Sequence, residues 1–550
     1  MKMNNDNKTF MKRLLIAGGA IALAAATAAV VHKTYKKHAL MAADSKKLSP
    51  KRNIYIDGSS LSALAAAAFL VSEGKCAPSS VHIYGLPANT LSGIDYGSAL
   101  HSFKLLMTIT DAEDEDGLFV ADVMDNMAFE SVPEPVDADK AGELLPMGLK
   151  PSRQLMKKIL KYAAKMAKMS DDELNETSVM DFFADDVFFE SDLYLYLETV
   201  SGIKPEYKLA ELIKRLELMS AYNSSAMAAL TCKLVPAQYI LDYLDECEID
   251  IKPDALISDA ELDEDGKIFA IDVFDNETKM KLYLNKNDFV IIGAGDLCDG
   301  ASCGSFSACA PVEENVIPPL WSALAEKSAT FGNPCELYDK ESPVMEFDIT
   351  DDDGYLLNKL CEFADCKPEN GLSLILSETP WKLCVTSLPY NGDAYAQSIE
   401  FDDDVITEVP EEEIPEQAPI RVRVTRSDIE GDFMDKSARE CTGVELLFEL
   451  CAQVGLADDW DEVLDRIKEV NISYYPYMNA AMRAHKGADV FPKPMPCPNC
   501  VMAGMFANLN GAPAGTVEQE IFSGRCASDL ITGRKARKLS KAPKINFAKL

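Results

Sequence analysis

The turn after the first apolar strand pattern carries residues that could cradle the phosphates of a dinucleotide. The run 53–57 reads as a buried strand and precedes Gly58 and an alanine-rich helix pattern over 61–70. In dinucleotide-binding turns, three glycines make the tight turn, admit the pyrophosphate and let helix and strand pack closely. Only Gly58 keeps its glycine here, because Ser60 and Ala63 occupy the other two positions. The turn predicts a nucleotide-type β-α-β unit with fewer phosphate contacts.

The ribose contact of such a unit is also altered. Dinucleotide-binding domains carry an acid at the end of the second strand for the ribose hydroxyls. The second strand pattern, Val81–Tyr84, ends instead at Gly85. A fold that keeps the β-α-β unit but has lost tight nucleotide binding fits this pattern equally well.

Histidine and cysteine argue against two other kinds of chemistry. The chain has 5 histidines, which speaks against a histidine-based triad or a histidine-rich metal centre. Cys497 and Cys500 form a C-x-x-C, but a zinc site needs about four ligands and no second pair follows at finger-like spacing. We expect a solvent-facing turn there, with metal binding as the minor alternative.

Composition and charge indicate a globular protein of several domains. The 550 residues exceed one ordinary domain, and 47% of them are hydrophobic. A net charge of −35 disfavours nucleic acid as a partner. The 15 scattered cysteines fit a reducing compartment better than a disulfide framework.

Both ends of the chain suggest contact with a membrane. Residues 14–31 are uncharged and flanked by basic residues, which predicts an N-terminal transmembrane helix. The slightly larger basic count after this segment places the protein body on the cytoplasmic side. A cleaved signal peptide and a buried alanine-rich helix are the alternatives. The basic tail 534–550 could contact anionic lipid heads or stay solvated.

Apolar periodicity divides the chain into consecutive regions. We expect an α/β fold with a Rossmann-like FAD/NAD(P)-binding domain, an inserted substrate domain and a mostly helical C-terminal region. The predicted regions are the anchor and linker 1–51, the first part of the nucleotide domain 52–150, a helical insertion 151–235, the rest of that domain with a β-meander 236–310, the substrate domain 311–430, the C-terminal helical region 431–533 and the tail 534–550.

Short blocks along residues 52–532 resemble, in order and spacing, the oleate hydratases, also called the myosin-cross-reactive antigen family. The resemblance rests on Gly58-Ser59 with the helix to Leu70, Phe188-Phe189-Glu190-Ser191, Lys204-Pro205, Ala210-Glu211, the turn containing Gly295, Asp299, Ser302 and Gly304-Ser305, Trp321, Leu324 and Lys327 with Phe331-Gly332-Asn333-Pro334, Glu440-Cys441-Thr442-Gly443, Gly504-Met505-Phe506 and Thr516-Val517-Glu518.

The resemblance implies an FAD-binding fold with a fatty-acid channel. Members of the family add water to a cis double bond of an unsaturated fatty acid, so the flavin would serve structure and electrostatics. Relatives also suggest a homodimer. The implied cofactor contacts are Gly58, Ser59, Ser60, Ala63, Gly295, Asp299, Ser302, Gly304, Gly504, Met505 and Thr516.

The proton carriers that the resemblance implies are missing from this sequence. Hydrating an alkene needs a general acid and a general base. The family's Glu has no counterpart between Gly85 and Asp111, and its Tyr positions fall on Met227 and Leu230, with Tyr222 the nearest tyrosine. The available substitutes are Asp95, Tyr96 and His101, although His101 also reads as an ordinary structural histidine.

Three functions therefore stay open. In the first, hydration persists with the substitute residues. In the second, the chain is a non-catalytic relative that binds fatty acyl chains, or a partner, at the membrane. The third is a flavin oxidoreductase related to the amine oxidases or desaturases. The shared β-α-β start allows this third function, but the block order and residues 331–334 argue against it.

Overall fold

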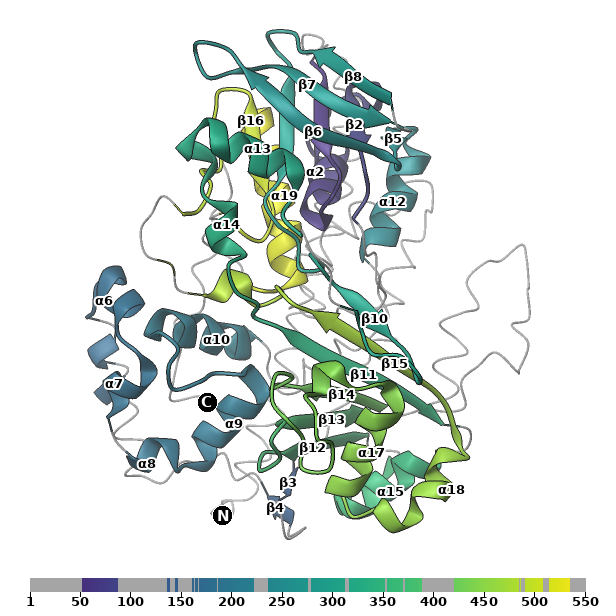
Figure 1. Cartoon of the computed structure of the whole chain (residues 1–550). Helices are drawn as coiled ribbons and strands as arrows, with labels where there is room; N and C mark the ends of the chain where they lie inside the picture. Colours follow the sequence, from purple (N-terminus) through teal and green to yellow (C-terminus); the bar gives the residue numbers. More distant parts are fainter. Residues whose placement is uncertain are drawn as a thin grey trace, which may run out of the picture.

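Three β-sheets and a separate group of helices make up the described part of the chain (Figure 1). The computed structural model describes residues 52–87, 136–138, 144–146, 161–221, 236–387, 420–507 and 514–534, with short gaps at 163, 167, 185, 276–277, 312–315, 352–353, 369–370, 484 and 486–489. The first sheet lies at the top of Figure 1 and the second below it.

The first sheet is the predicted nucleotide-type sheet. It has five strands in the order β16-β9-β1-β2-β5, and all neighbours are parallel. Its apolar runs are buried on both faces, as parallel sheets require, so they show no polar alternation. The strands are β1 (Ile54–Asp57), β2 (Val81–Tyr84), β5 (Asp250–Lys252), β9 (Phe289–Gly293) and β16 (Cys500–Ala503).

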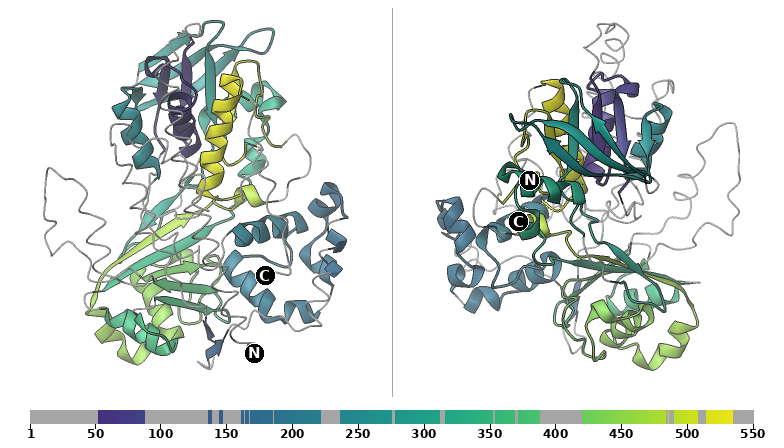
Figure 2. Two further views of the ribbon diagram at one scale, coloured as in Figure 1. Left: turned by 180° about the vertical axis from the view of Figure 1, so that it is seen from behind. Right: turned by 45° about the horizontal axis from the view of Figure 1, so that its top comes forward.

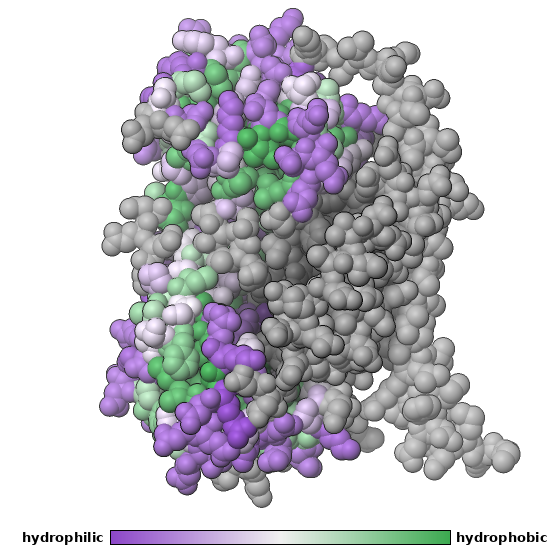
Figure 3. All heavy atoms as spheres, turned by 90° about the vertical axis from the view of Figure 1, so that its right-hand side faces the viewer, coloured by the Kyte–Doolittle hydropathy of each residue, from purple (hydrophilic) through white to green (hydrophobic). Residues whose placement is uncertain are grey.

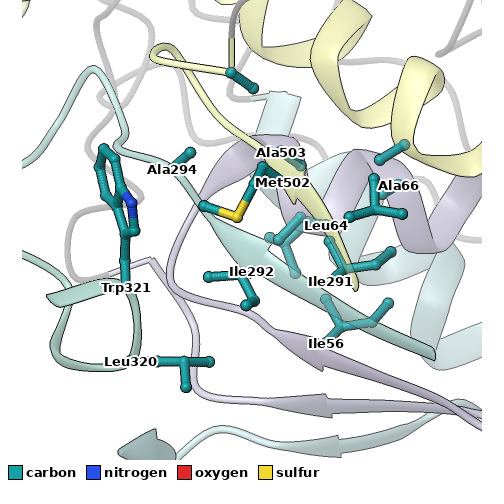
Figure 4. Packing of buried hydrophobic residues seen from close by; sticks show 14 of the residues in the cluster. Ile56, Leu64, Ala66, Ile291, Ile292, Ala294, Leu320, Trp321, Met502 and Ala503 are labelled. Carbon is teal, nitrogen blue, oxygen red and sulfur yellow. The ribbon is translucent and has the colours of Figure 1, made fainter. Parts of the chain in front are cut away.

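Three helices cover one face of this sheet, as Figure 2 shows from behind. They are α2 (Leu61–Ser72), α12 (Pro236–Glu246) and α19 (Val517–Thr532). Helices α2 and α19 lie unusually close, because a Cβ at Gly524 would lie 2.3 Å from the carbonyl oxygen of Ser62. The small side chains of α2 permit this approach. Figure 4 shows Leu64 of this helix packed with Ile291 and Met502 of the sheet.

The predicted β-meander covers the other face of the sheet. It consists of β6 (Ala255–Leu262), β7 (Ile268–Asp275) and β8 (Thr278–Tyr283), paired antiparallel. Helix α13 (Pro319–Lys327) packs beside β6, and the short α14 (Pro334–Leu337) follows it. Buried Trp321 of α13 donates its indole N–H to the carbonyl of Phe331 at 2.8 Å.

The second sheet has eight strands in the order β10-β15-β11-β14-β13-β12-β3-β4. Helices α15 (Tyr355–Phe363), α17 (Gly443–Gln453) and α18 (Trp460–Leu464) contribute to its own apolar core. The strands are β3 (Val136–Ala138), β4 (Leu144–Pro146), β10 (Ser302–Gly304), β11 (Val344–Asp351), β12 (Leu372–Leu376), β13 (Leu383–Ser387), β14 (Ile420–Val424) and β15 (Ile467–Tyr475).

The predicted helical insertion forms a third group with its own aromatic core. Its helices are α6 (Asp171–Glu176), α7 (Val179–Phe183), α8 (Asp186–Phe189), α9 (Asp192–Ser201) and α10 (Leu209–Ala221). Phe183 and Phe188 stack with ring centroids 4.0 Å apart. The group contacts the second sheet where the Thr425 hydroxyl donates to the carbonyl of Thr199 at 2.5 Å.

The C-terminal region differs from the mostly helical prediction. Besides α17–α19 it supplies β15 to the second sheet and β16 to the first. Within this region, α18 ends at Leu464 and β15 begins at Ile467. The side chains of β15 tend to alternate between buried and more exposed positions. This period of two is typical of a strand that has one face packed against the core.

The predicted membrane contacts fall outside the described residues, since these exclude 1–51 and 535–550. No helix of the part that is described is long and apolar enough to cross a bilayer. Hydrophilic residues form much of the described surface in Figure 3, with apolar patches between them.

Candidate functional site

The turn between β1 and α2 has the tight geometry that its glycine predicts. The Gly58 amide donates to the carbonyl of Tyr84 at 2.8 Å. A Cβ at Gly58 would lie 2.2 Å from the carbonyl oxygen of Gly85, so a larger residue would separate β1 from the end of β2. The Ser59 amide turns back to the Asp57 carboxyl at 3.3 Å.

The N-terminus of α2 is already satisfied by the protein itself. Ser60 caps the helix, and its hydroxyl accepts the amide of Ala63 at 3.2 Å. The Leu61 amide donates to Oδ2 of Asp296 at 2.7 Å. Amides at a helix N-terminus attract anions, and in dinucleotide domains that anion is the pyrophosphate. In this chain the Asp296 carboxyl, which follows β9, takes that role.

Two further acids and a tyrosine surround Asp296. Asp299 accepts the Asp296 amide at 2.7 Å and also accepts the hydroxyl of Tyr338. Glu520 reaches in from α19 and accepts the hydroxyl of Ser62. Its second oxygen, Oε1, is buried and has no hydrogen-bond partner among the described residues. We call Asp57, Asp296, Asp299 and Glu520 the carboxyl cluster.

Burial raises the pKa of every acid in the cluster. It raises the pKa of Asp57 to about 6, while burial and the neighbouring Asp296 raise that of Asp299 to about 8. The pKa values of Asp296 and Glu520 are raised in the same way. No lysine or arginine within the described ranges forms an ion pair with the cluster, so protonation is what removes the charge.

The residues of the turn do not fit the pyrophosphate of FAD. The amide that would receive a phosphate oxygen is bonded to Asp296, and three more carboxyl groups lie close by. Gly85 also leaves the ribose without its usual acid. A dinucleotide would have to displace Asp296 and bring its own negative charge toward acids that form no ion pair with a cation of the described residues.

Three of the other predicted cofactor residues, Gly295, Gly504 and Met505, lie where the turn after β9 meets the turn after β16. The Met505 amide donates to the carbonyl of Gly295 at 3.0 Å. A Cβ at Gly504 would lie 2.5 Å from the carbonyl carbon of Ala294, so the two turns touch through their backbones. Thr516 caps α19 through the amide of Gln519, whose side chain donates to the Met505 carbonyl at 2.7 Å.

The remaining predicted residues do not join this group. Ser302 and Gly304 lie in β10 and pair with Tyr474 and Ile472 of the second sheet, so their role there is structural. The catalytic candidates Asp95, Tyr96 and His101 lie outside the described residues.

The C-x-x-C turn is also different from its prediction. Cys497 and Cys500 are both buried whereas Pro498 between them is exposed, so the turn faces solvent only in part. Across the described ranges, no group of three or more potential ligands is arranged to hold a metal ion.

Sequence reasoning missed Asp296, Tyr338 and Glu520. Asp296 stands directly after the glycine turn that follows β9, so its place at the mouth of the sheet could have been inferred. Glu520 lies one turn into α19, and only the close packing of α19 on α2 brings it to Ser62. Tyr338 follows the block 331–334 and carries no signal of its own.

Comparison with protein families identifies the group to which the chain is related. The model of the MCRA family matches residues 148–401 and 412–528, which is more than half of the chain. The chain belongs to the MCRA family. The match covers strands β10 to β15 of the second sheet, the helical group, the meander and the C-terminal turn, and it confirms the resemblance seen in the sequence.

A curated relative of this MCRA member is linoleate hydratase from Lactiplantibacillus plantarum. The two are 22% identical over 413 residues, which are 69% of this chain and 71% of the relative.

Similar solved structures include an oxidoreductase from Methanosarcina mazei, with a TM-score of 0.44 and 12% identity over 86% of this chain and 99% of the other. CtdE in complex with FAD and a substrate has a TM-score of 0.38 and 8% identity over 89% of this chain and 83% of the other. A Pyrococcus furiosus protein has a TM-score of 0.43 and 11% identity over 88% and 97%.

Proposed function

We propose that this protein binds an unsaturated fatty acid and adds water across a cis double bond to give a hydroxy fatty acid. The observation that carries the proposal is the MCRA match, because it spans the helical group and most of the second sheet as well as strands β5, β9 and β16 of the nucleotide-type sheet. The likeness to a linoleate hydratase over most of both chains supports the same reaction class.

The reaction needs a protonated acid near a polar partner that can handle water. Asp299 and Tyr338 offer such a pair. The pKa of Asp299 is raised to about 8, so its carboxyl group is largely protonated at neutral pH, and Tyr338 donates its hydroxyl to it. We propose Asp299 as a proton donor alongside the earlier candidates Asp95, Tyr96 and His101. No step of this proposal requires a flavin.

A second candidate is a non-catalytic member that binds fatty acyl chains. The hydrogen bond from Leu61 to Asp296 favours it, since this bond occupies the place of the cofactor phosphate. The substituted family positions Met227 and Leu230 point the same way.

Mass spectrometry after incubation with oleate or linoleate separates the two candidates. The hydratase predicts a product heavier by one water, with and without added FAD. Binding of the fatty acid without any adduct, across a range of pH, supports the non-catalytic member. If the protein does not bind the fatty acid at all, both the hydratase and the non-catalytic binding function are excluded.

Variants then identify the proton donor. Asp299→Asn keeps a neutral polar group of the same shape. Asp95→Asn tests the earlier candidates, Asp95, Tyr96 and His101, through one of their members. The exposed Asp458 in its Asp458→Asn form is the matched control. Activity that survives Asp299→Asn unchanged would exclude Asp299 as the donor.

We also propose that residues 14–31 attach the protein to a membrane, with its body on the cytoplasmic side, and that it forms a homodimer. Fractionation of the full chain beside a chain lacking 1–51 tests the first point, and light scattering tests the second.

A further inference from the structure

The C-x-x-C turn at the start of β16 brings two thiols together. The Cys500 amide donates to the carbonyl of Cys497 at 3.3 Å, which closes a four-residue turn. The ends of such a turn lie within about 7 Å, a range that includes the Cα separations of disulfides. The Cys500 thiol is also hydrogen-bonded to the Cys497 sulfur.

Asn499 holds this turn in place from inside the protein. Its side chain donates to the carbonyl of Ile268 at 2.9 Å and accepts the amide of the same residue at 2.9 Å. The turn is therefore tied to the first residue of β7, and its geometry is fixed before any reaction. Such preorganisation favours a bond between the two thiols of one turn.

The two thiols differ in accessibility and in acidity. Cys500 is fully buried, whereas Cys497 is 8% exposed and precedes the exposed Pro498. The hydrogen bond from Cys500, against the opposing effect of burial, lowers the pKa of Cys497 to about 7. Burial raises the pKa of Cys500 well above its usual value. Reactive dithiols pair a thiolate near the surface with a buried second thiol in this way.

We propose that Cys497 and Cys500 form a thiol–disulfide exchange site for low-molecular-weight disulfides such as glutathione disulfide. The Cys497 thiolate attacks one sulfur of the disulfide, the S–S bond breaks, and one thiolate leaves and takes up a proton. Cys500 then attacks the Cys497 sulfur, and its proton goes to the second departing thiolate. The two protein thiols lose two electrons and two protons, and the small disulfide becomes two thiols.

The chain contains a matched control pair. Cys361 and Cys366 are also hydrogen-bonded to each other, on and just after α15. Burial raises the pKa of Cys366, so it is not activated in the way that Cys497 is. The exposed Cys303 reports simple surface reactivity, and its pKa is likewise raised by burial.

The test follows each cysteine of the reduced full-length protein as it reacts with glutathione disulfide. Samples are quenched with acid and N-ethylmaleimide, digested and analysed by mass spectrometry. We expect a Cys497–Cys500 disulfide that forms at least about tenfold faster than a Cys361–Cys366 disulfide, with a rate that rises with pH and is half-maximal near a pKa of about 7.

The Cys500→Ser and Cys500→Ala variants should stop the reaction at a glutathione adduct on Cys497. Two such variants guard against a folding defect in either one. The proposal is overturned if Cys497 stays reduced in both while Cys303 reacts, if the control pair oxidises equally fast, or if the purified protein holds a stoichiometric metal on the two thiols.

Discussion

Two buried clusters of this protein deal with charge in opposite ways. At the N-terminus of α2, the carboxyl cluster forms no ion pair with a cation of the described residues, and burial raises the pKa of its acids. Between α9 and the second sheet, buried Glu198 instead pairs with Arg426 and lies 3.7 Å from Lys382. The contribution of the first cluster to stability should therefore depend on pH. The contribution of the second should depend on the presence of each charged partner. An added anion would approach acids at the carboxyl cluster, whereas it would approach two cations at the second cluster.

The pH dependence of stability should be the largest effect. The folded chain holds protons on the carboxyl cluster that the unfolded chain releases above about pH 4. Stability is therefore full below that pH and falls as pH rises through the raised pKa values, about 6 for Asp57 and about 8 for Asp299. We expect a loss on the order of 5 kcal/mol between pH 4 and pH 8, measured by urea unfolding.

Asp57→Asn serves as the control for that measurement. It should reduce the slope between pH 4 and pH 6, where Asp299 still contributes, and leave the part from pH 6 to pH 8 in place. An identical slope in this variant would assign the pH dependence to the general repulsion of an acidic chain.

Breaking the ion-paired cluster should come next in size. Glu198→Ala leaves Arg426 and Lys382 partly buried without their carboxylate, and we expect a loss of about 3 kcal/mol at every pH from 5 to 8. The exposed Asp428, which pairs with Lys204, is the matched comparison, since Asp428→Ala should cost below about 1 kcal/mol. Equal losses in the two variants would contradict the contrast between the clusters.

Glu520→Gln should have a smaller effect, and one confined to high pH. Gln cannot ionise, yet its side-chain oxygen can still accept the hydroxyl of Ser62. We expect little change at pH 5 and a gain of about 1 kcal/mol at pH 8, by the same urea assay. A loss at both values would show that Glu520 is ionised and needed as a charge.

Much of the nucleotide-type sheet could be predicted because its signals are local. Strands β1, β2 and β9 are continuous apolar runs, and the helix pattern over 61–70 became α2. Strand β16 is also a short apolar run, but its place in this sheet depends on pairing with β9, more than 200 residues away in the sequence. The turn at Gly58 was predicted. The sequence did not predict that the Asp296 carboxyl would accept the Leu61 amide there.

The carboxyl cluster lay beyond sequence reasoning for the same reason. Asp57, Asp296 and Glu520 come from three distant segments, and the packing of α19 on α2 brings the last of them in. Each acid alone reads as one of the 89 acidic residues of the chain. Their raised pKa values arise from burial together, which no single segment encodes.

FAD titration at pH 8 tests the central claim, that Asp296 holds the place of the cofactor phosphate. Isothermal calorimetry and flavin fluorescence would compare the natively purified protein with the Asp296→Ala and Asp296→Asn variants. We predict no stoichiometric flavin in the purified protein, and FAD binding at least about tenfold tighter in Asp296→Ala, where the Leu61 amide is freed. A tight, stoichiometric yellow complex of the unaltered protein would contradict the account.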